Sequence, residues 1–161
     1  MKKMIGGLAI GAVSVLTLVF YLASLGEQAT PVATLTPNDK DVVSLGEEIY
    51  AQNCKSCHGT KLEGQANWRQ RDANGYMPAP PHNESGHSWH HSDDYLFSMT
   101  KYGIEKMIGK KYPNNMPVYE GQLSDEQIIA ALSYIKSTWS RRIQRQHDQI
   151  NTRANAHKKE G

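Results

Sequence analysis

The 161-residue chain has only two cysteines, two phenylalanines and no large excess of charge of either sign. Two cysteines cannot form the disulfide framework that stabilises many small secreted domains. Because 18 lysines and arginines face 16 acidic residues, the net charge of +2 excludes a strongly basic nucleic-acid binder and an acidic disordered chain. No segment alternates apolar and polar residues, so the sequence predicts no β-strands. The length allows one ordinary domain with an anchor or a tail.

A long hydrophobic run occurs near the N-terminus. Met4–Leu25 contains no charged residue, and a helix of these 22 residues spans about 33 Å, slightly more than the hydrocarbon core of a bilayer. Because Lys2 and Lys3 precede the run, we predict that residues 1–25 form a transmembrane anchor and that the chain after it is exported. The alternative is a cleaved signal peptide, whose apolar segment is usually shorter and ends at a clearer cleavage site.

The rest of the chain divides into three parts by composition. Residues 26–43 are mostly small or polar and are interrupted by prolines, so we predict a linker there. Residues 44–140 contain the remaining periodic segments and motifs, and we assign them to one domain. Residues 141–161 hold six lysines and arginines against two acidic residues, and we predict a basic, weakly helical C-terminal tail.

Three segments of the domain have the pattern of helices. Capping boxes predict helices over 44–53, beginning at Ser44, and over 124–139, the second continuing weakly into the tail. A third helix is predicted over 92–102, where two acidic residues follow a serine and a glycine follows the last turn. Residues 59–91 contain four glycines and three prolines and are predicted to be mostly loop. So few short helices make a poor core by themselves, and we therefore expect another group to fill the middle of the domain.

Both cysteines belong to a single motif, Cys54-Lys55-Ser56-Cys57-His58, which has the C-x-x-C-H spacing of covalent haem attachment. In such a motif the two thiols add to the haem vinyl groups, and the histidine imidazole binds the iron. A thioredoxin-like dithiol would need a βαβ context and a four-cysteine zinc site would need a second pair, and the sequence has neither. We therefore predict one covalently attached haem c, bound through Cys54, Cys57 and His58.

A second iron ligand is predicted on the opposite side of the haem. Met116 lies just before the last predicted helix and is followed by a proline, and an unbranched thioether on such a braced loop suits the open face of the iron. Met77, also followed by a proline, is the rival methionine, and a histidine between His82 and His91 would instead give bis-histidine ligation. Histidine–methionine ligation leaves no open position on the iron, so we expect outer-sphere electron transfer and not an enzyme.

Other residues of the domain accompany the haem motif. The first helix carries Gly46 and Tyr50, the last carries Tyr134, Asn115-Met116-Pro117 precedes the last helix, and residues 79–91 are rich in proline and histidine. With these features, residues 44–140 resemble a class I c-type cytochrome of a membrane-anchored bacterial monohaem subgroup. The resemblance implies an all-α class I cytochrome c fold, with three to four short helices and long loops around one covalent haem, behind an N-terminal transmembrane helix.

The resemblance also implies contacts for individual residues. The first and last helices should cross where Gly46 and Tyr50 meet Tyr134. The carbonyl of Pro80 should accept a hydrogen bond from Nδ1–H of His58, which would orient the imidazole. Trp89 and Tyr102 are candidate donors to the haem propionates, through N–H and O–H, although each is equally suited to plain packing.

The anchor, the haem motif and the resemblance together predict a membrane-tethered carrier that passes single electrons between exported respiratory redox proteins. The expected location is the bacterial inner membrane, with the haem domain on the periplasmic side, and neither nucleic acid nor a small-molecule substrate is expected as a partner. Two alternatives stay open. One is a haem subunit of a larger oxidoreductase, docked through the basic tail. The other is a copper-handling protein that uses the His82–His91 cluster, although those histidines also have ordinary structural uses.

Overall fold

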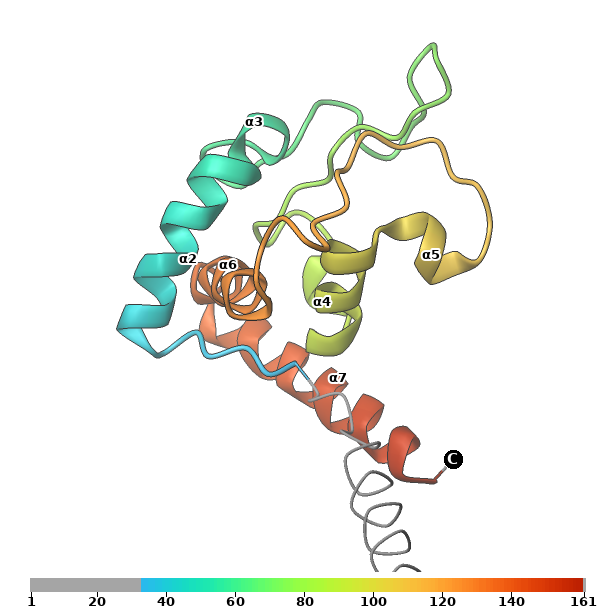
Figure 1. Ribbon diagram of the computed structural model, residues 1–161. Helices are drawn as coiled ribbons and strands as arrows, with labels where there is room; N and C mark the ends of the chain where they lie inside the picture. The colour runs from blue at the N-terminus through green and yellow to red at the C-terminus, as the bar shows by residue number, and fades with distance from the viewer. Residues whose placement is uncertain (1–32, 161) are drawn as a thin grey trace, which may run out of the picture. The chain divides into compact units, whose positions relative to one another are not determined.

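The computed structural model describes residues 33–160, with side chains up to Lys158. The predicted anchor, residues 1–25, and the first part of the predicted linker, residues 26–32, lie outside the described residues. No helix within the described range is both long enough and apolar enough to cross a membrane. Every regular element of this part of the chain is a helix (Figure 1), as the lack of alternating segments predicts.

The described α-helices run from α2 to α7 (Figure 1). A short 3₁₀ helix, η1, lies between α3 and α4. In chain order the helices are α2 (Lys40–Asn53), α3 (Lys55–His58), η1 (Ser88–His90), α4 (Asp93–Tyr102), α5 (Ile104–Ile108), α6 (Asp125–Ser137) and α7 (Arg141–Glu160). The helices predicted over 92–102 and 124–139 correspond to α4 and α6. The segment between α3 and η1 is loop, as predicted, whereas the single turn of α5 was not predicted.

Capping side chains set the starts of α4 and α6. The hydroxyl of Ser92 accepts a hydrogen bond from the backbone N–H of Tyr95, and that of Ser124 accepts one from Gln127. The Gln127 side chain accepts in return from the backbone N–H of Ser124, which completes the predicted capping box. At its other end α4 stops at Gly103, whose φ of 79° lies in the region that glycine adopts without strain.

The prediction that the first helix begins at Ser44 is wrong. The helix α2 starts at Lys40, and its cap is Asp39, whose Oδ1 accepts hydrogen bonds from the backbone N–H groups of Asp41 and Val42. Ser44 is an exposed residue inside the helix. The serine–glutamate spacing of a capping box also occurs between neighbours on the surface of a helix, so the pattern alone does not mark a first turn.

The end of the predicted linker is part of the folded domain. Ala33 and Leu35 are each only 5% exposed. The backbone N–H of Leu35 donates to Oδ2 of Asp93 at 3.0 Å, and the backbone N–H of Thr36 donates to the hydroxyl of Ser133 at 2.9 Å. These bonds attach the segment before α2 to both α4 and α6.

The helices α2 and α6 cross at a glycine. A Cβ atom added to Gly46 would lie 2.0 Å from the carbonyl oxygen of Ala130 and 2.8 Å from Cβ of Tyr134, so the two helices touch there through their backbones. One turn along α2, the rings of Tyr50 and Tyr134 lie 5.5 Å apart. This is the contact that the resemblance implies for Gly46, Tyr50 and Tyr134.

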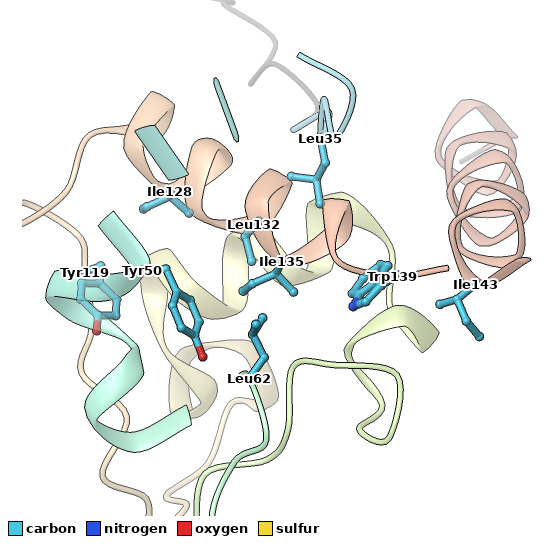
Figure 2. Packing of buried hydrophobic residues seen from close by; sticks show 9 residues of the cluster. All are labelled: Leu35, Tyr50, Leu62, Tyr119, Ile128, Leu132, Ile135, Trp139 and Ile143. Carbon is cyan, nitrogen blue, oxygen red and sulfur yellow. The ribbon is translucent and has the colours of Figure 1, made fainter. Parts of the chain in front are cut away.

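The hydrophobic core lies along the inner face of α6 (Figure 2). Its buried members come from α2, from α6 and the turn after it, from α7 and from three non-helical segments: Leu35, Tyr50, Leu62, Tyr119, Ile128, Leu132, Ile135, Trp139 and Ile143. Half-buried residues such as Cys54 and Trp89 pack against this cluster. The core therefore reaches from the segment before α2 to the C-terminal helix and borders the haem motif.

The C-terminal tail is helical, but it is not a weak continuation of the preceding helix. The helix α6 ends at Ser137, and α7 is a separate helix of 20 residues. Between them the indole of Trp139 turns inward and donates to the carbonyl of His82 at 2.8 Å. The helix α7 buries Ile143 and His147, which lie one turn apart, and these contacts stabilise a sequence too polar to indicate a strong helix by itself.

Candidate haem-binding site

The C-x-x-C-H motif lies where α2 ends. Cys54 terminates α2, with its N–H bonded to the carbonyl of Tyr50, and Cys57 and His58 follow on the single turn of α3. Residues three and four apart lie on the same side of a helical turn, so this turn gathers both thiols and the imidazole. His58 is 8% exposed, Cys54 is half-buried and Cys57 is exposed. Burial, followed by the nearby Cys57, raises the pKa of the Cys54 thiol to about 11.

Two tyrosine hydroxyls hold the backbone on either side of the motif. The hydroxyl of Tyr119 donates to the carbonyl of Asn53 at 2.8 Å, and that of Tyr50 donates to the carbonyl of Gly59 at 2.9 Å. Burial raises the pKa of Tyr119 to about 12 and that of Tyr50 further still, so both hydroxyls keep their protons and act as donors. Sequence reasoning missed Tyr119, whose only signal was an aromatic residue between the Met-Pro pair and the last cap.

The His58 ring is oriented by the predicted proline carbonyl. Nδ1 of His58 lies 2.8 Å from the carbonyl oxygen of Pro80, and because a carbonyl only accepts, Nδ1 is the protonated nitrogen. The proline segment is itself held by Gln65, whose N–H donates to the carbonyl of Ala79, while the N–H of the neighbouring Gly64 donates to the carbonyl of His58. Nε2 of His58 is therefore the nitrogen left to bind a metal.

A second imidazole covers one face of His58. The ring of His82 stacks on it with centroids 3.9 Å apart and planes inclined by 26°. The backbone N–H of His82 donates to Leu62 and its carbonyl accepts from Trp139, so both of its main-chain groups are held. Burial lowers the pKa of His58 and places that of His82 well below its ordinary value, so both rings are neutral at neutral pH. Sequence reasoning considered His82 as an alternative metal ligand or as a residue that caps a loop carbonyl, and missed this stack.

The two methionine candidates lie on different loops. Met116 is half-buried, and its N–H donates to Oδ1 of Asn114 at 3.0 Å, so its loop is braced on the side away from Pro117. Met77 is also half-buried, within the segment that leads to Pro80. The assignment of Met116 as the second iron ligand stays a prediction.

The two candidate propionate donors lie in different surroundings. The indole N–H of Trp89 donates to the carbonyl of Glu84 at 3.4 Å, and its ring stacks on His90 at 3.6 Å. The Tyr102 ring lies 4.2 Å from Nζ of Lys106, a cation–π contact. Trp89 therefore already has a main-chain acceptor, and the propionate role of both residues stays a prediction.

The other histidines of the 82–91 segment each pack against an aromatic ring. His87 stacks on Trp68 with centroids 5.2 Å apart, and His91 stacks on Tyr95 with centroids 4.4 Å apart. Among the described residues no three histidine, cysteine or acidic side chains are grouped so that they could hold a metal ion. These contacts give the segment a packing role that needs no second metal.

Comparison with known proteins points to one family. The family model described as Cytochrome c matches residues 43–139, which span the chain from α2 to the turn after α6. No curated protein and no solved structure gave a significant match. The match ends where α7 is about to begin.

A cytochrome c domain implies covalently attached haem c, and the residues at the motif fit that group. Cys54 and Cys57 are free thiols and not a disulfide, as thioether formation requires. His58 offers Nε2 to the iron because Nδ1 is bonded to Pro80. The thiols and the oriented imidazole would hold the haem.

Proposed function

Because the chain belongs to the cytochrome c family, we propose that it is a membrane-tethered monohaem cytochrome that passes single electrons between exported respiratory redox proteins. Haem-based electron transfer, without enzymatic chemistry, is the general role of the family. The tether, the exported location and the redox partners are inferred from residues 1–25, where an uncharged run long enough to span a bilayer follows Lys2 and Lys3.

The observation that carries the proposal is the orientation of His58. Its Nδ1 is 2.8 Å from the Pro80 carbonyl and one ring face is covered by His82, so the imidazole is held before any partner binds. Such preorganisation suits electron transfer, because a ligand that hardly moves adds little to the reorganisation that accompanies a change of iron charge. When bound, the haem supplies the one-electron couple.

The proposal assigns His58 and Met116 to the two axial positions. Met116 is supported by the Asn114 brace at its N–H and by the Pro117 that follows it, which restrict the loop. With two protein ligands, the iron would keep no open site for oxygen or peroxide. Because Cys57 is exposed, a redox partner could approach the bound haem from that side of the motif.

Two measurements on native membranes test this function. Intact mass spectrometry should find residues 1–25 still attached to a chain that carries the mass of one haem. In the same membranes, addition of a respiratory electron donor should reduce the haem, and admission of the terminal acceptor should reoxidise it. A mature N-terminus near Glu27 would show that the run is a cleaved signal peptide and not a tether. A haem that neither addition reduces or reoxidises would contradict the role as an electron carrier.

A further inference from the structure

The helix α7 is an addition to the cytochrome c domain. It begins at Arg141, two residues beyond the end of the family match at residue 139. Nothing in haem binding requires it, yet the domain holds it through several specific contacts. Its buried face carries Ile143, at 2% exposed, and His147, at 0%.

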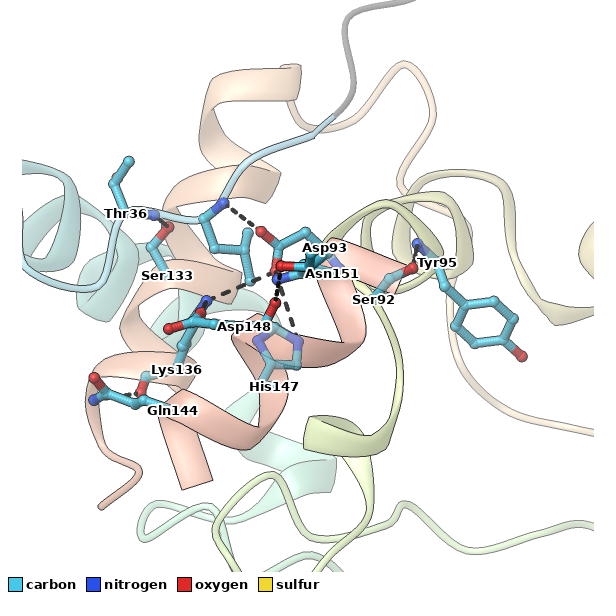
Figure 3. A network of polar contacts seen from close by, with 12 residues as sticks. Thr36, Ser92, Asp93, Tyr95, Ser133, Lys136, Gln144, His147, Asp148 and Asn151 are labelled. Atoms are coloured by element: carbon cyan, nitrogen blue, oxygen red, sulfur yellow. Dashed lines mark hydrogen bonds and ion pairs between the residues drawn. The ribbon is translucent and has the colours of Figure 1, made fainter. Parts of the chain in front are cut away.

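A polar network fixes α7 to α4 and α6 (Figure 3). The side chain of Asn151 donates to Oδ1 of Asp93 at 2.9 Å and accepts from the backbone N–H of Asp93 at 2.8 Å. Asp93 also lies 3.6 Å from Nε2 of His147. Nζ of the buried Lys136 donates to Asp148 at 2.7 Å. The last contact matters for charge, because Asp148 is the one acidic residue between Arg141 and Lys158 and it is already paired.

The opposite side of α7 displays arginines, and the acidic side chain that borders them, Asp148, is paired with Lys136. Its four arginines, Arg141, Arg142, Arg145 and Arg153, are exposed and are here called the arginine face. At 3.6 residues per turn they fall within an arc of roughly 120° and extend over about 18 Å of helix. None of the four forms a salt bridge with another residue in the described part of the chain. The described side of the helix therefore presents four cations without a salt-bridge partner, of which Arg142 lies within electrostatic range of Glu84.

One end of the arginine face adjoins the place where the chain enters the domain. A pocket of about 390 Å³ is lined by Arg141, Arg145 and the paired Asp148 from α7 and by Leu35, Pro37 and Asn38 from the segment before α2. This segment continues directly from residue 32 and hence from the proposed tether. One end of the arginine face and residues 35–38 therefore share one side of the described domain.

We propose that the arginine face binds the phosphate headgroups of anionic lipids and so orients the tethered haem domain on the membrane. This inference rests on the proposed function, since it takes the membrane to be the surface next to residues 33–38. A guanidinium group matches phosphate oxygens with two parallel N–H donors, and none of the four arginines is held in a salt bridge within the described residues. The face carries no large apolar side chain that could insert, so the helix lies on the headgroups and not among the acyl chains.

The expected strength follows from the number of arginines. Each cation near an anionic surface strengthens binding about fivefold, so the four together contribute up to several hundredfold at low salt. The effect should fall steeply as salt rises, because the Debye length shortens from about 10 Å at 0.1 M to about 3 Å at 1 M. An acidic protein would meet the same charges, but the pocket shared with the segment before α2 favours the surface to which that segment leads.

The test uses the full-length, haem-loaded chain with two kinds of vesicle, phosphatidylcholine alone and phosphatidylcholine mixed with phosphatidylglycerol. Flotation measures membrane attachment, and linear dichroism of the haem band in oriented bilayers measures the orientation of the domain. The test variant replaces the four arginines of the arginine face by glutamine. The control variant changes four exposed lysines that form no salt bridge within the described residues to glutamine: Lys40, Lys61, Lys110 and Lys111. Both variants therefore lose four positive charges.

The inference expects flotation with both kinds of vesicle, but an ordered haem only with phosphatidylglycerol. High salt and the arginine variant should both abolish that order, and the lysine variant should keep it. If the protein attaches to both kinds of vesicle and the orientation of the haem depends neither on lipid charge nor on the four arginines, the inference is wrong and the tether is kept. Binding only to phosphatidylglycerol vesicles, lost in the arginine variant, would support the arginine face and overturn the tether. A parallel measurement uses an acidic redox protein in place of the vesicles. If the arginine variant loses binding to that protein while the haem orientation on bilayers does not depend on lipid charge, the arginine face binds protein and the lipid proposal is wrong.

Discussion

At the scale of single residues, the most constrained side chain of the site is His58. The carbonyl of Pro80 holds one edge of its ring and the imidazole of His82 covers one face. The hydroxyls of Tyr50 and Tyr119 hold the carbonyls of Gly59 and Asn53, on either side of the motif. Four contacts, from α2, from the segment 80–82 and from Tyr119, thus position the proximal imidazole and the two thiols, and the second iron ligand is the least constrained part of the site.

Replacing Met116 by alanine tests the second ligand. A thioether favours reduced iron, so its loss should lower the reduction potential by on the order of 100 mV or more. The same variant should lose the weak near-infrared band of methionine-bound ferric haem. Absorption spectroscopy and a redox titration of the purified full-length protein measure both effects. Met77→Ala is the matched control and should keep the band; if the two variants behave the other way round, Met77 is the ligand.

At the scale of elements, the contact between α2 and α6 fixes the direction in which the motif points. The motif follows α2 directly, and α2 lies against α6 at Gly46, where the added Cβ of any other residue would overlap the backbone of Ala130. A displacement of α2 along α6 would therefore move both thiols and the imidazole together. The helix crossing is a structural requirement of the haem site as well as of the core.

Replacing Gly46 by alanine tests this crossing. The new Cβ would lie 2.0 Å from the carbonyl oxygen of Ala130, so the helices must separate. Overpacking costs up to about 3 kcal/mol, and so close an approach to backbone places the cost in the upper part of that range, about 2–3 kcal/mol. The gain of about 1 kcal/mol in helix propensity offsets only part of it. We expect a net loss of about 1–2 kcal/mol in the free energy of unfolding, measured by guanidinium denaturation of the haem-loaded protein. Ser44→Ala, at an exposed position of the same helix, should change it by less than about 0.5 kcal/mol, and equal values for the two variants would contradict the close crossing.

At the scale of the whole molecule, the C-terminal helix is tied to the domain through a buried histidine. His147 is surrounded by charged and titratable groups from every element packed around it: Lys136 of α6, Asp93 of α4, His91 after η1 and Asp148 of α7. Burial, and after it the positive charge of Lys136, lower the pKa of His147, against a smaller opposite effect of Asp93. Folding therefore favours the neutral ring.

This lowered pKa predicts a pH dependence of stability. Below the ordinary pKa of about 6.5 the unfolded chain binds a proton that the folded chain excludes, so stability falls as the pH drops from there to the lowered folded pKa. His147 should contribute a slope of up to about 1.4 kcal/mol per pH unit within that range. In His147→Leu the free energy of unfolding should depend less steeply on pH between about 7 and 5, whereas the exposed His157→Gln on the same helix should match the unchanged protein. Equal slopes for all three proteins would show that His147 titrates alike in both states.

The haem motif and the ends of α4 and α6 were readable from the sequence, because each depends on residues within a few positions of one another. The spacing of Cys54, Cys57 and His58 is a local property, and so is the capping box at Ser124. The contacts of Pro80, Gly46 and Tyr134 needed the resemblance to a known family, because they join distant segments.

Other features were decided by the tertiary structure alone. The residues at Ser44 match a capping box, but the helix does not begin there. It starts about one turn earlier, where Asp39 accepts hydrogen bonds from its first free N–H groups. The polar sequence of α7 becomes a 20-residue helix because Ile143, His147 and Asn151 find partners on η1, α4 and α6. The sequence by itself determined which chemical groups the chain carries and where short-range spacing brings them together. Which of its polar residues are buried, and which four arginines are left facing outward, depends on packing between residues far apart in the chain.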